Sequence, residues 1–95
     1  MTIFTKDPDD VADFAVDFAQ LLAVGETLSN PTVVVPVGVT LTPAGKAAPA
    51  VSGSKVVFWL SGGTAAASYP VAVECDTSGG RHFADNPVLV VYGRR

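Results

Sequence analysis

The sequence has very little of the material from which catalytic and metal sites are built. It contains one cysteine, one histidine and only 16% charged residues over a length of 95. The single cysteine, Cys75, excludes an internal disulfide, so nothing demands an oxidising compartment. The single histidine, His82, excludes a multi-histidine metal site and a relay of two histidines within one chain. We therefore expect no catalytic residue, no cofactor, no metal site and production inside the cell.

Long apolar runs and an excess of positive charge are also missing. No apolar run approaches the ~20 residues that a membrane-spanning helix needs, and the N-terminus lacks the pattern of a signal peptide. Nine acidic against six basic residues give a net charge of -3, which argues against nucleic acid or an anionic membrane as partner. The chain is nevertheless 48% hydrophobic. We expect part of that apolar surface to be buried against other protein subunits.

The sequence is rich in signals for β-strands. Runs of β-branched residues alternate with turn clusters about every ten residues, which is the spacing of a β-sandwich. The predicted strands are 32–35, 37–41, 55–60, 69–75 and 88–92. The small residues and proline of 44–50 predict a surface loop or an irregular edge strand.

The first quarter of the chain allows two interpretations. Apolar residues recur at helical spacing over 11–22, after a proline suited to a first helical turn. The alternative is an edge strand with Phe14, Val16 and Phe18 on one face and carboxylates on the other. The residues alone leave both open.

Acidic residues gather near the N-terminus, and a calcium site is the specific hypothesis that they raise. Their spacing lacks the central glycine and the terminal glutamate of an EF-hand loop. We favour capping and solvated positions along an edge, because most acidic runs are exposed to water. The residues concerned are Asp7, Asp9, Asp10, Asp13 and Asp17.

Two glycine pairs, Gly62-Gly63 and Gly79-Gly80, are reminiscent of phosphate-binding loops. Neither has the spacing of a P-loop and neither precedes a helical pattern, so we predict turns that need positive φ. Ser61 has no G-x-S-x-G elbow around it and is predicted to belong to the first of these turns.

The environments of three side chains that often occur in functional sites can also be predicted. Cys75 shares the apolar face of an alternating strand, so we expect a buried, inert thiol. His82 follows a turn and is predicted to be exposed. Trp59 is expected to pack in the core between two sheets rather than to form a sugar-stacking platform with Tyr69.

Several short motifs occur in an order that resembles one family. The most specific part is W-L-S-G-G-T at 59–64 with T-x-x-G-R at 77–81, preceded by K-D-P-D at 6–9 and V-P-V-G-V-T at 35–40. The D-F pairs at 13–14 and 17–18 and Tyr69 complete the pattern. Over nearly its whole length the chain resembles small virion proteins of tailed bacteriophages, the phage fibre–tail adaptor proteins.

The resemblance implies an immunoglobulin-like β-sandwich and a non-enzymatic structural subunit of the phage particle. It also decides for a strand, not a helix, around Phe14 and Phe18, where the family often has Tyr and Trp. The segment Thr42–Ala50 is longer and richer in Ala and Pro than the family pattern.

We therefore predict an all-β, immunoglobulin-like antiparallel sandwich of about seven strands that forms one domain over 1–95. The predicted core consists of Val34, Phe58 or Trp59, Tyr69, Val71, Val73, Val88 and Val90.

The predicted function is to join or adapt tail and fibre components in the virion, in several copies arranged by symmetry. The expected partners are tail, fibre, neck or capsid subunits, reached through loop tips and edge strands. Residues 1–10 are expected to be a docking arm, since Ile3 and Phe4 are too apolar for a free tail. Arg94 and Arg95 form a small basic patch that is solvated or faces an acidic neighbour. The alternatives are a capsid decoration or head–tail connector protein and, in another class, a carbohydrate-binding module.

Overall fold

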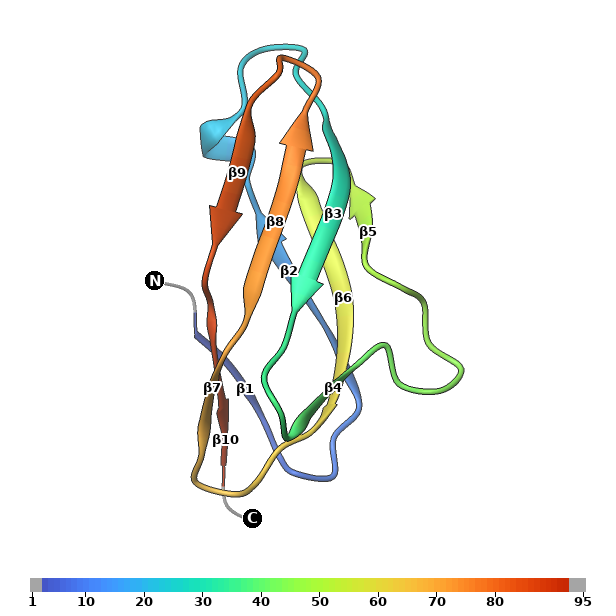
Figure 1. Cartoon of the computed structure of the whole chain (residues 1–95), viewed down its shortest axis with the longest axis vertical. Helices are drawn as coiled ribbons and strands as arrows, with labels where there is room; N and C mark the ends of the chain where they lie inside the picture. Colours follow the sequence, from blue (N-terminus) through green and yellow to red (C-terminus); the bar gives the residue numbers. More distant parts are fainter. Residues whose placement is uncertain (1–2, 93–95) are drawn as a thin grey trace.

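The chain folds almost entirely as β-structure. The computed structural model describes residues 3–92, and the all-β prediction is confirmed. The elements are β1 (Ile3–Lys6), β2 (Ala12–Asp17), the 3-10 turn η1 (Ala19–Leu21), β3 (Leu28–Val34), β4 (Val39–Leu41), β5 (Ala50–Ser52), β6 (Lys55–Gly62), β7 (Ser68–Pro70), β8 (Ala72–Thr77), β9 (His82–Asp85) and β10 (Val88–Val91) (Figure 1). Within residues 3–92 there is no helix long and apolar enough to cross a membrane.

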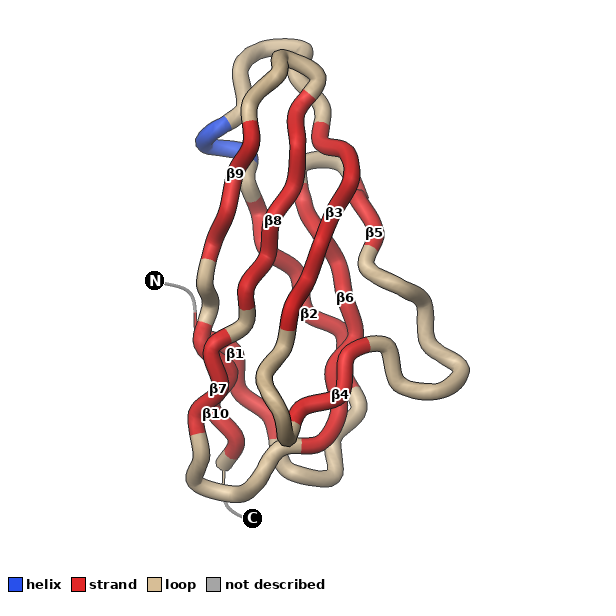
Figure 2. Tube along the Cα trace, viewed as in Figure 1, coloured by secondary structure: helices blue, strands red, loops and turns tan. Residues whose placement is uncertain are grey.

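The strands form three small sheets, two of which face each other. The β3–β8–β9 sheet lies in front of the β2–β6–β4 sheet, in which β5 also pairs with β6 (Figures 1 and 2). The β1–β10–β7 sheet continues the molecule at its lower end. Every pairing is antiparallel except that of β1 with β10, which is parallel. The result is an elongated body of 43 × 28 × 20 Å.

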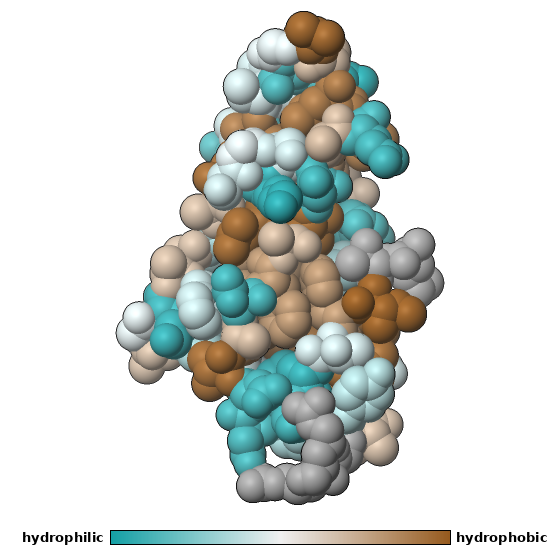
Figure 3. Space-filling view, turned by 180° about the vertical axis from the view of Figure 1, so that it is seen from behind, coloured by the Kyte–Doolittle hydropathy of each residue, from teal (hydrophilic) through white to brown (hydrophobic). Residues whose placement is uncertain are grey.

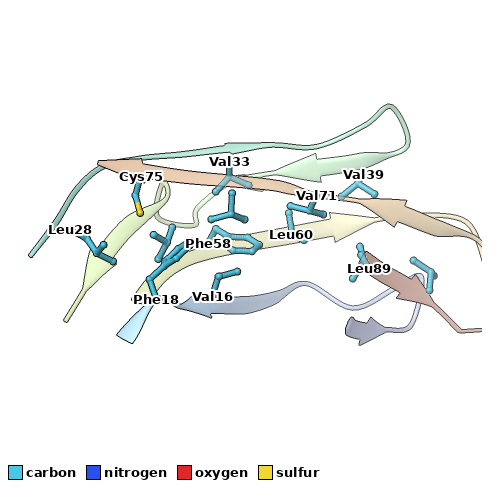
Figure 4. Close-up of a cluster of buried hydrophobic side chains, with 13 residues drawn as sticks. Val16, Phe18, Leu28, Val33, Val39, Phe58, Leu60, Val71, Cys75 and Leu89 are labelled. Carbon is cyan, nitrogen blue, oxygen red and sulfur yellow. The ribbon is translucent and has the colours of Figure 1, made fainter. Parts of the chain in front are cut away.

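The hydrophobic core lies between the two facing layers (Figure 4). Phe58 and Leu60 of β6 and Val73 and Cys75 of β8 belong to this core, and all four side chains are fully buried. The Phe4 ring joins this core from β1, with its centroid 4.9 Å from that of Phe14 and 6.0 Å from that of Phe58. The buried hydrophobic cluster consists of Val16, Phe18, Leu28, Val33, Val39, Val56, Phe58, Leu60, Val71, Val73, Cys75, Leu89 and Val91.

Alternating strands were predicted correctly. β2 is an edge strand with Phe14 and Val16 facing the core and Asp13 and Asp17 facing outward, so the strand interpretation holds over the helical one. In the segment predicted as one strand over 69–75, the alternation is also confirmed. That segment is divided into β7 and β8 at Val71, whose backbone N–H leaves the ladder to donate to the Pro87 carbonyl at 2.9 Å.

Four predicted core positions are wrong. Val34 is 57% exposed because its neighbour Val33 takes the core position. Leu89 and Val91 are fully buried, so Val88 and Val90 face outward. The fourth is Trp59, because on β6 it is Phe58 that is buried while Trp59 lies half-buried on the outer side. In each case the residue has apolar neighbours on both sides in the sequence, so local alternation does not decide which of them faces inward.

Between residues 3 and 92 there are ten strands where about seven were predicted, because β1, β5 and β9 are short additional strands. β1 lies inside the expected docking arm 1–10 and pairs with β10 of its own chain, so Phe4 is packed within the molecule. Ile3 remains 60% exposed, and its docking on a partner stays a prediction, as do the single domain over 1–95 and the immunoglobulin-like assignment. Met1, Thr2, Arg94 and Arg95 lie outside the described residues.

Candidate functional site

The two most exposed large apolar side chains of the described chain stand at opposite ends of the long axis. Val24 and Val37 have relative exposures of 107% and 100%. Val24 belongs to the loop between η1 and β3 at the upper end, and Val37 to the turn between β3 and β4 at the lower end (Figure 1). From behind, a strongly hydrophobic group forms the tip of the upper end (Figure 3). A single exposed valine is common on a protein surface and does not by itself indicate a binding site. The contacts that hold each loop in place are therefore described for both ends.

The upper loop is held by Glu26, Thr77 and Arg81, which we call the upper-end network. Glu26 Oε2 accepts hydrogen bonds from Thr77 Oγ1 at 2.6 Å and from Arg81 Nε at 3.1 Å. Its Oε1 accepts from the Ala23 N–H at 2.9 Å and pairs with Arg81 Nη2. Arg81 Nη2 also donates to the Leu21 carbonyl at 2.8 Å. Arg81 first, then Thr77 and the Ala23 N–H, hold the pKa of Glu26 at about 2.

Backbone and ring contacts reinforce this end. The Ser78 N–H donates to the Thr27 carbonyl at 2.9 Å, and the Thr27 N–H donates to Ser78 Oγ at 3.0 Å. The Arg81 guanidinium lies 5.0 Å from the centroid of the Phe83 ring, which stacks on Phe18 at 6.1 Å. The T-x-x-G-R motif therefore shapes the surface on which the upper loop rests.

The lower end is held by Lys6, Gly62 and Gly63, which we call the lower-end cluster. Lys6 is 4% exposed, and its Nζ donates to the carbonyls of Asp7 and Gly62, each at 2.6 Å. The Gly63 N–H donates to the Gly38 carbonyl at 2.8 Å, which ties the turn that carries Val37 to the end of β6. These hydrogen bonds to carbonyl oxygens offset part of the free-energy cost of burying the ammonium group of Lys6.

Glycine is required in this cluster by conformation and by space. Gly62 and Gly63 have φ of +81° and +94°, as the sequence predicted. A Cβ on Gly63 would lie 2.7 Å from Val91 Cγ2. The prediction for Ser61 is wrong, because β6 continues through Gly62 and Ser61 is paired with Thr40 in the sheet.

Tyr69 completes the lower end. Its hydroxyl accepts a hydrogen bond from the Thr64 N–H at 2.8 Å, and this interaction with Thr64 lowers the pKa of the phenol. Tyr69 packs against the core from β7, while Trp59 lies on the outer face of the β2–β6–β4 sheet with Lys46 Nζ 4.7 Å from its ring centroid. The two aromatic rings therefore do not form one stacking surface.

The acidic residues near the N-terminus act as local caps where their contacts are described. Asp17 Oδ1 accepts from the Ala19 N–H at 2.9 Å and from Ser54 Oγ at 2.8 Å, and these bonds, Ala19 first, lower the pKa of Asp17. Asp10 Oδ2 accepts from the Asp7 N–H at 3.0 Å. The capping prediction is confirmed for Asp10 and Asp17. Across residues 3–92 no three His, Cys, Asp or Glu side chains are grouped to hold a metal ion.

The histidine and the cysteine have the environments that the sequence predicted. Cys75 is buried, and burial raises the pKa of its thiol. His82 is exposed, with Nδ1 2.7 Å from Asp76 Oδ1 and Nε2 2.8 Å from Glu74 Oε1. These hydrogen bonds, that to Asp76 first, raise the pKa of His82. The part of the chain described here contains no pocket.

The comparison with known families decides the identity of the chain. The model of the podophage GP4 fiber-tail adaptor protein gp77 family matches residues 6–90. The chain belongs to this family. No curated protein is significantly similar to it. The matched range starts at Lys6 and includes Arg81, so it contains both the lower-end cluster and the upper-end network. Membership of the fiber-tail adaptor family makes this a bacteriophage tail protein with a structural adaptor role.

Two residues of these ends have roles that no sequence pattern indicates. Glu26 lies 55 residues from Arg81, and no local pattern connects them. Lys6 was noted only as the first residue of a motif, and an inward lysine has no sequence signal of its own. The one available signal was the arginine of the T-x-x-G-R motif, which indicates a charged contact but does not identify its partner.

Proposed function

We propose that the chain is a non-enzymatic subunit that joins fibre to tail by binding one neighbouring virion protein at each end. The observation that carries the proposal is the fiber-tail adaptor family match over residues 6–90. The geometry supports it, since Val24 and Val37 are presented on separately fixed loops at opposite ends of a body 43 Å long. A connector must contact one partner at each end. Loops that are already fixed favour such contacts, because they lose little conformational entropy on binding.

The partners that we propose are tail, fibre or neck subunits, contacted by several copies of the chain within the virion after synthesis in the host cytoplasm. Repeated copies follow from the symmetry of phage tails, because a symmetric assembly uses the same contact in each copy. The surroundings of the cysteine and the histidine support a role without catalysis. Cys75 is buried, and both ring nitrogens of His82 are bound to carboxylates.

The proposal is tested with purified tail and fibre proteins of the same phage, immobilised separately. Val24→Asp is expected to abolish binding to one of them and Val37→Asp to abolish binding to the other. Ala15→Asp is the control, because Ala15 is exposed in the middle of β2 and belongs to neither loop. Binding of the chain to empty capsids and to neither tail nor fibre would contradict the proposal and favour a capsid decoration protein.

A further inference from the structure

The outer face of the β2–β6–β4 sheet carries an indole and a carboxylate side by side. Trp59 of β6 is paired with Asp13 of β2 in the antiparallel register, so both side chains lie on the same face. The Phe18 N–H donates to the Ser54 carbonyl in continuation of this ladder, which makes Asp13 and Trp59 a pair without mutual backbone hydrogen bonds. The Cβ atoms of such a pair are about 4.5–5.5 Å apart. The carboxylate and the indole are therefore close enough to contact one ligand together.

The two outward carboxylates of β2 differ in what lies opposite them. Asp17 is paired with Lys55, and its Oδ1 accepts hydrogen bonds from the Ala19 N–H and from Ser54 Oγ. Asp13 is exposed, and its side chain makes no hydrogen bond or ion pair within residues 3–92. It has an aromatic ring opposite, where Asp17 has a cation. Asp13 is therefore the carboxylate of this face that a cation from outside the sheet can neutralise.

A cation already lies on the indole, and it comes from this chain. Lys46 Nζ is 4.7 Å from the centroid of the Trp59 ring, a distance at which an ammonium group is attracted to the face of an aromatic ring. Among the described residues no carboxylate is within ion-pair distance of Lys46. The indole face therefore accepts a cation in this fold, while the carboxylate of Asp13 is left for a second contact.

Lys46 is carried by the loop 43–49, which we call the strap. The strap connects β4 and β5, which both pair with β6, and it projects from the side of the body (Figure 1). Residues 44–48 are all exposed, so the strap is not anchored in the core. It begins after Thr42, whose φ of +54° is unfavourable for a β-branched residue. The contact of Lys46 with the Trp59 ring can therefore be exchanged for another contact at little cost.

We infer that Trp59 and Asp13 form a binding site for an arginine side chain of a partner protein, and that Lys46 occupies the indole until the partner displaces it. Arginine fits this pair, because its planar guanidinium stacks on an indole while its N–H groups donate to a carboxylate. A cation on an exposed ring changes a binding equilibrium only about two- to fivefold. A partner arginine that also reaches Asp13 therefore replaces Lys46. The inference does not depend on which proteins the two ends bind.

The test is a fluorescence titration of the full chain with the peptide acetyl-Gly-Arg-Gly-amide, since Trp59 is the only tryptophan of the chain. The arginine peptide should change the emission with half-saturation on the order of millimolar. The same peptide with citrulline, which has the shape of arginine without its charge, should bind far more weakly. Lys46→Met should tighten binding of the arginine peptide about two- to fivefold, because it removes the internal competitor. Lys55→Met is the matched control, because it removes the same charge from the same sheet away from the indole.

A second pair of variants tests the carboxylate. Asp13→Asn should weaken binding of the arginine peptide about two- to fivefold, whereas Asp85→Asn, which removes the same charge from β9 of another sheet, should leave it unchanged.

Three outcomes would overturn the inference. The first is equal binding of the arginine and citrulline peptides, or no response to either one far above millimolar concentration in both wild type and Lys46→Met. The second is an equal effect of Lys46→Met and Lys55→Met, and the third is an equal effect of Asp13→Asn and Asp85→Asn. Tail and fibre binding are measured separately, so a failure here is distinguishable from a failure of the proposed function.

Discussion

The two ends of the molecule hold their loops by different chemistry. At the upper end, Glu26 and Arg81 form an ion pair that responds to pH and to side-chain changes. At the lower end, Lys6 and Gly63 act through backbone carbonyls and close packing. The same task, fixing a loop tip, therefore depends on an ion pair at one end and on a buried lysine and close packing at the other.

The largest expected effect is at the lower end, from Gly63→Ala. Positive φ disfavours any residue with a Cβ, and the new methyl group would also lie 2.7 Å from Val91 Cγ2. Backbone strain and overpacking together should lower the free energy of unfolding by about 2–5 kcal/mol. Urea denaturation measures the loss. Gly80→Ala in the β8–β9 turn is the matched control, since Gly80 has φ +83° with nothing within 4 Å of its Cβ position; equal losses at both glycines would show that packing on Val91 is unimportant.

A somewhat smaller effect is expected from Lys6→Met, which keeps the length of the side chain but removes its hydrogen-bond donors. The carbonyls of Asp7 and Gly62 would lose their bonds to Nζ, at a cost of about 2–3 kcal/mol in the free energy of unfolding. Lys55→Met, at an exposed lysine of β6, should change stability by no more than about 0.5 kcal/mol. If both variants unfold at the same urea concentration as the wild type, the lysine does not hold the lower end.

At the upper end, the expected effect depends on pH. The pKa of Glu26 is lowered from 4.5 to about 2 in the folded chain. A carboxyl with a depressed folded pKa stabilises the fold fully above its unfolded value, so this stability is lost as the pH falls from 4.5 toward 2. Melting temperatures recorded across this interval should fall less steeply for Glu26→Gln than for wild type. Asp13→Asn, at an exposed carboxylate outside the network, should retain the wild-type slope.

Features that depend on neighbouring residues, such as which face of a strand points inward, could be predicted from the sequence. With the strand chosen from the family resemblance, the alternation of Phe14, Val16 and Phe18 predicts the inner face correctly. The alternation of Val73 and Cys75 does the same for its strand, because polar neighbours mark the outer side. The strand Val88–Val91 has no polar residue, so the prediction that Val88 and Val90 face the core is wrong: Leu89 and Val91 do. Trp59 is predicted in the core because a lone tryptophan of a β-sandwich usually packs between the sheets. In the structure Phe58 beside it takes that position, and the indole is half-buried with Lys46 over its ring.

Long-range relations could not be obtained in this way. β1 exists as a strand because β10, at the other end of the chain, pairs with it in parallel. The ion pair of Glu26 and Arg81 and the contact of Lys6 with Gly62 join residues 55 and 56 positions apart. Such pairs form only once the sandwich has closed, and a single sequence contains no pattern that connects them. The motifs that contain Lys6 and Arg81 can be recognised in the sequence, but the contacts by which these residues hold the two ends are visible only in the structure.

The smallest expected effect is at neither end, on the outer face of the β3–β8–β9 sheet. Hydrogen bonds to Asp76 and Glu74 raise the pKa of His82 above 6.5. A base with a raised folded pKa stabilises the fold fully below its unfolded value, and this stability is lost as the pH rises past 6.5 through the folded pKa. His82→Gln should therefore remove a slight loss of melting temperature as the pH rises past 6.5. Because the hydrogen bond to His82 also lowers the pKa of Asp76, the variant should slightly flatten the fall of melting temperature in acid. Because exposed ion pairs contribute little, an effect larger than that of Glu26→Gln would show that this face, rather than the upper end, contains the main electrostatic contribution to stability.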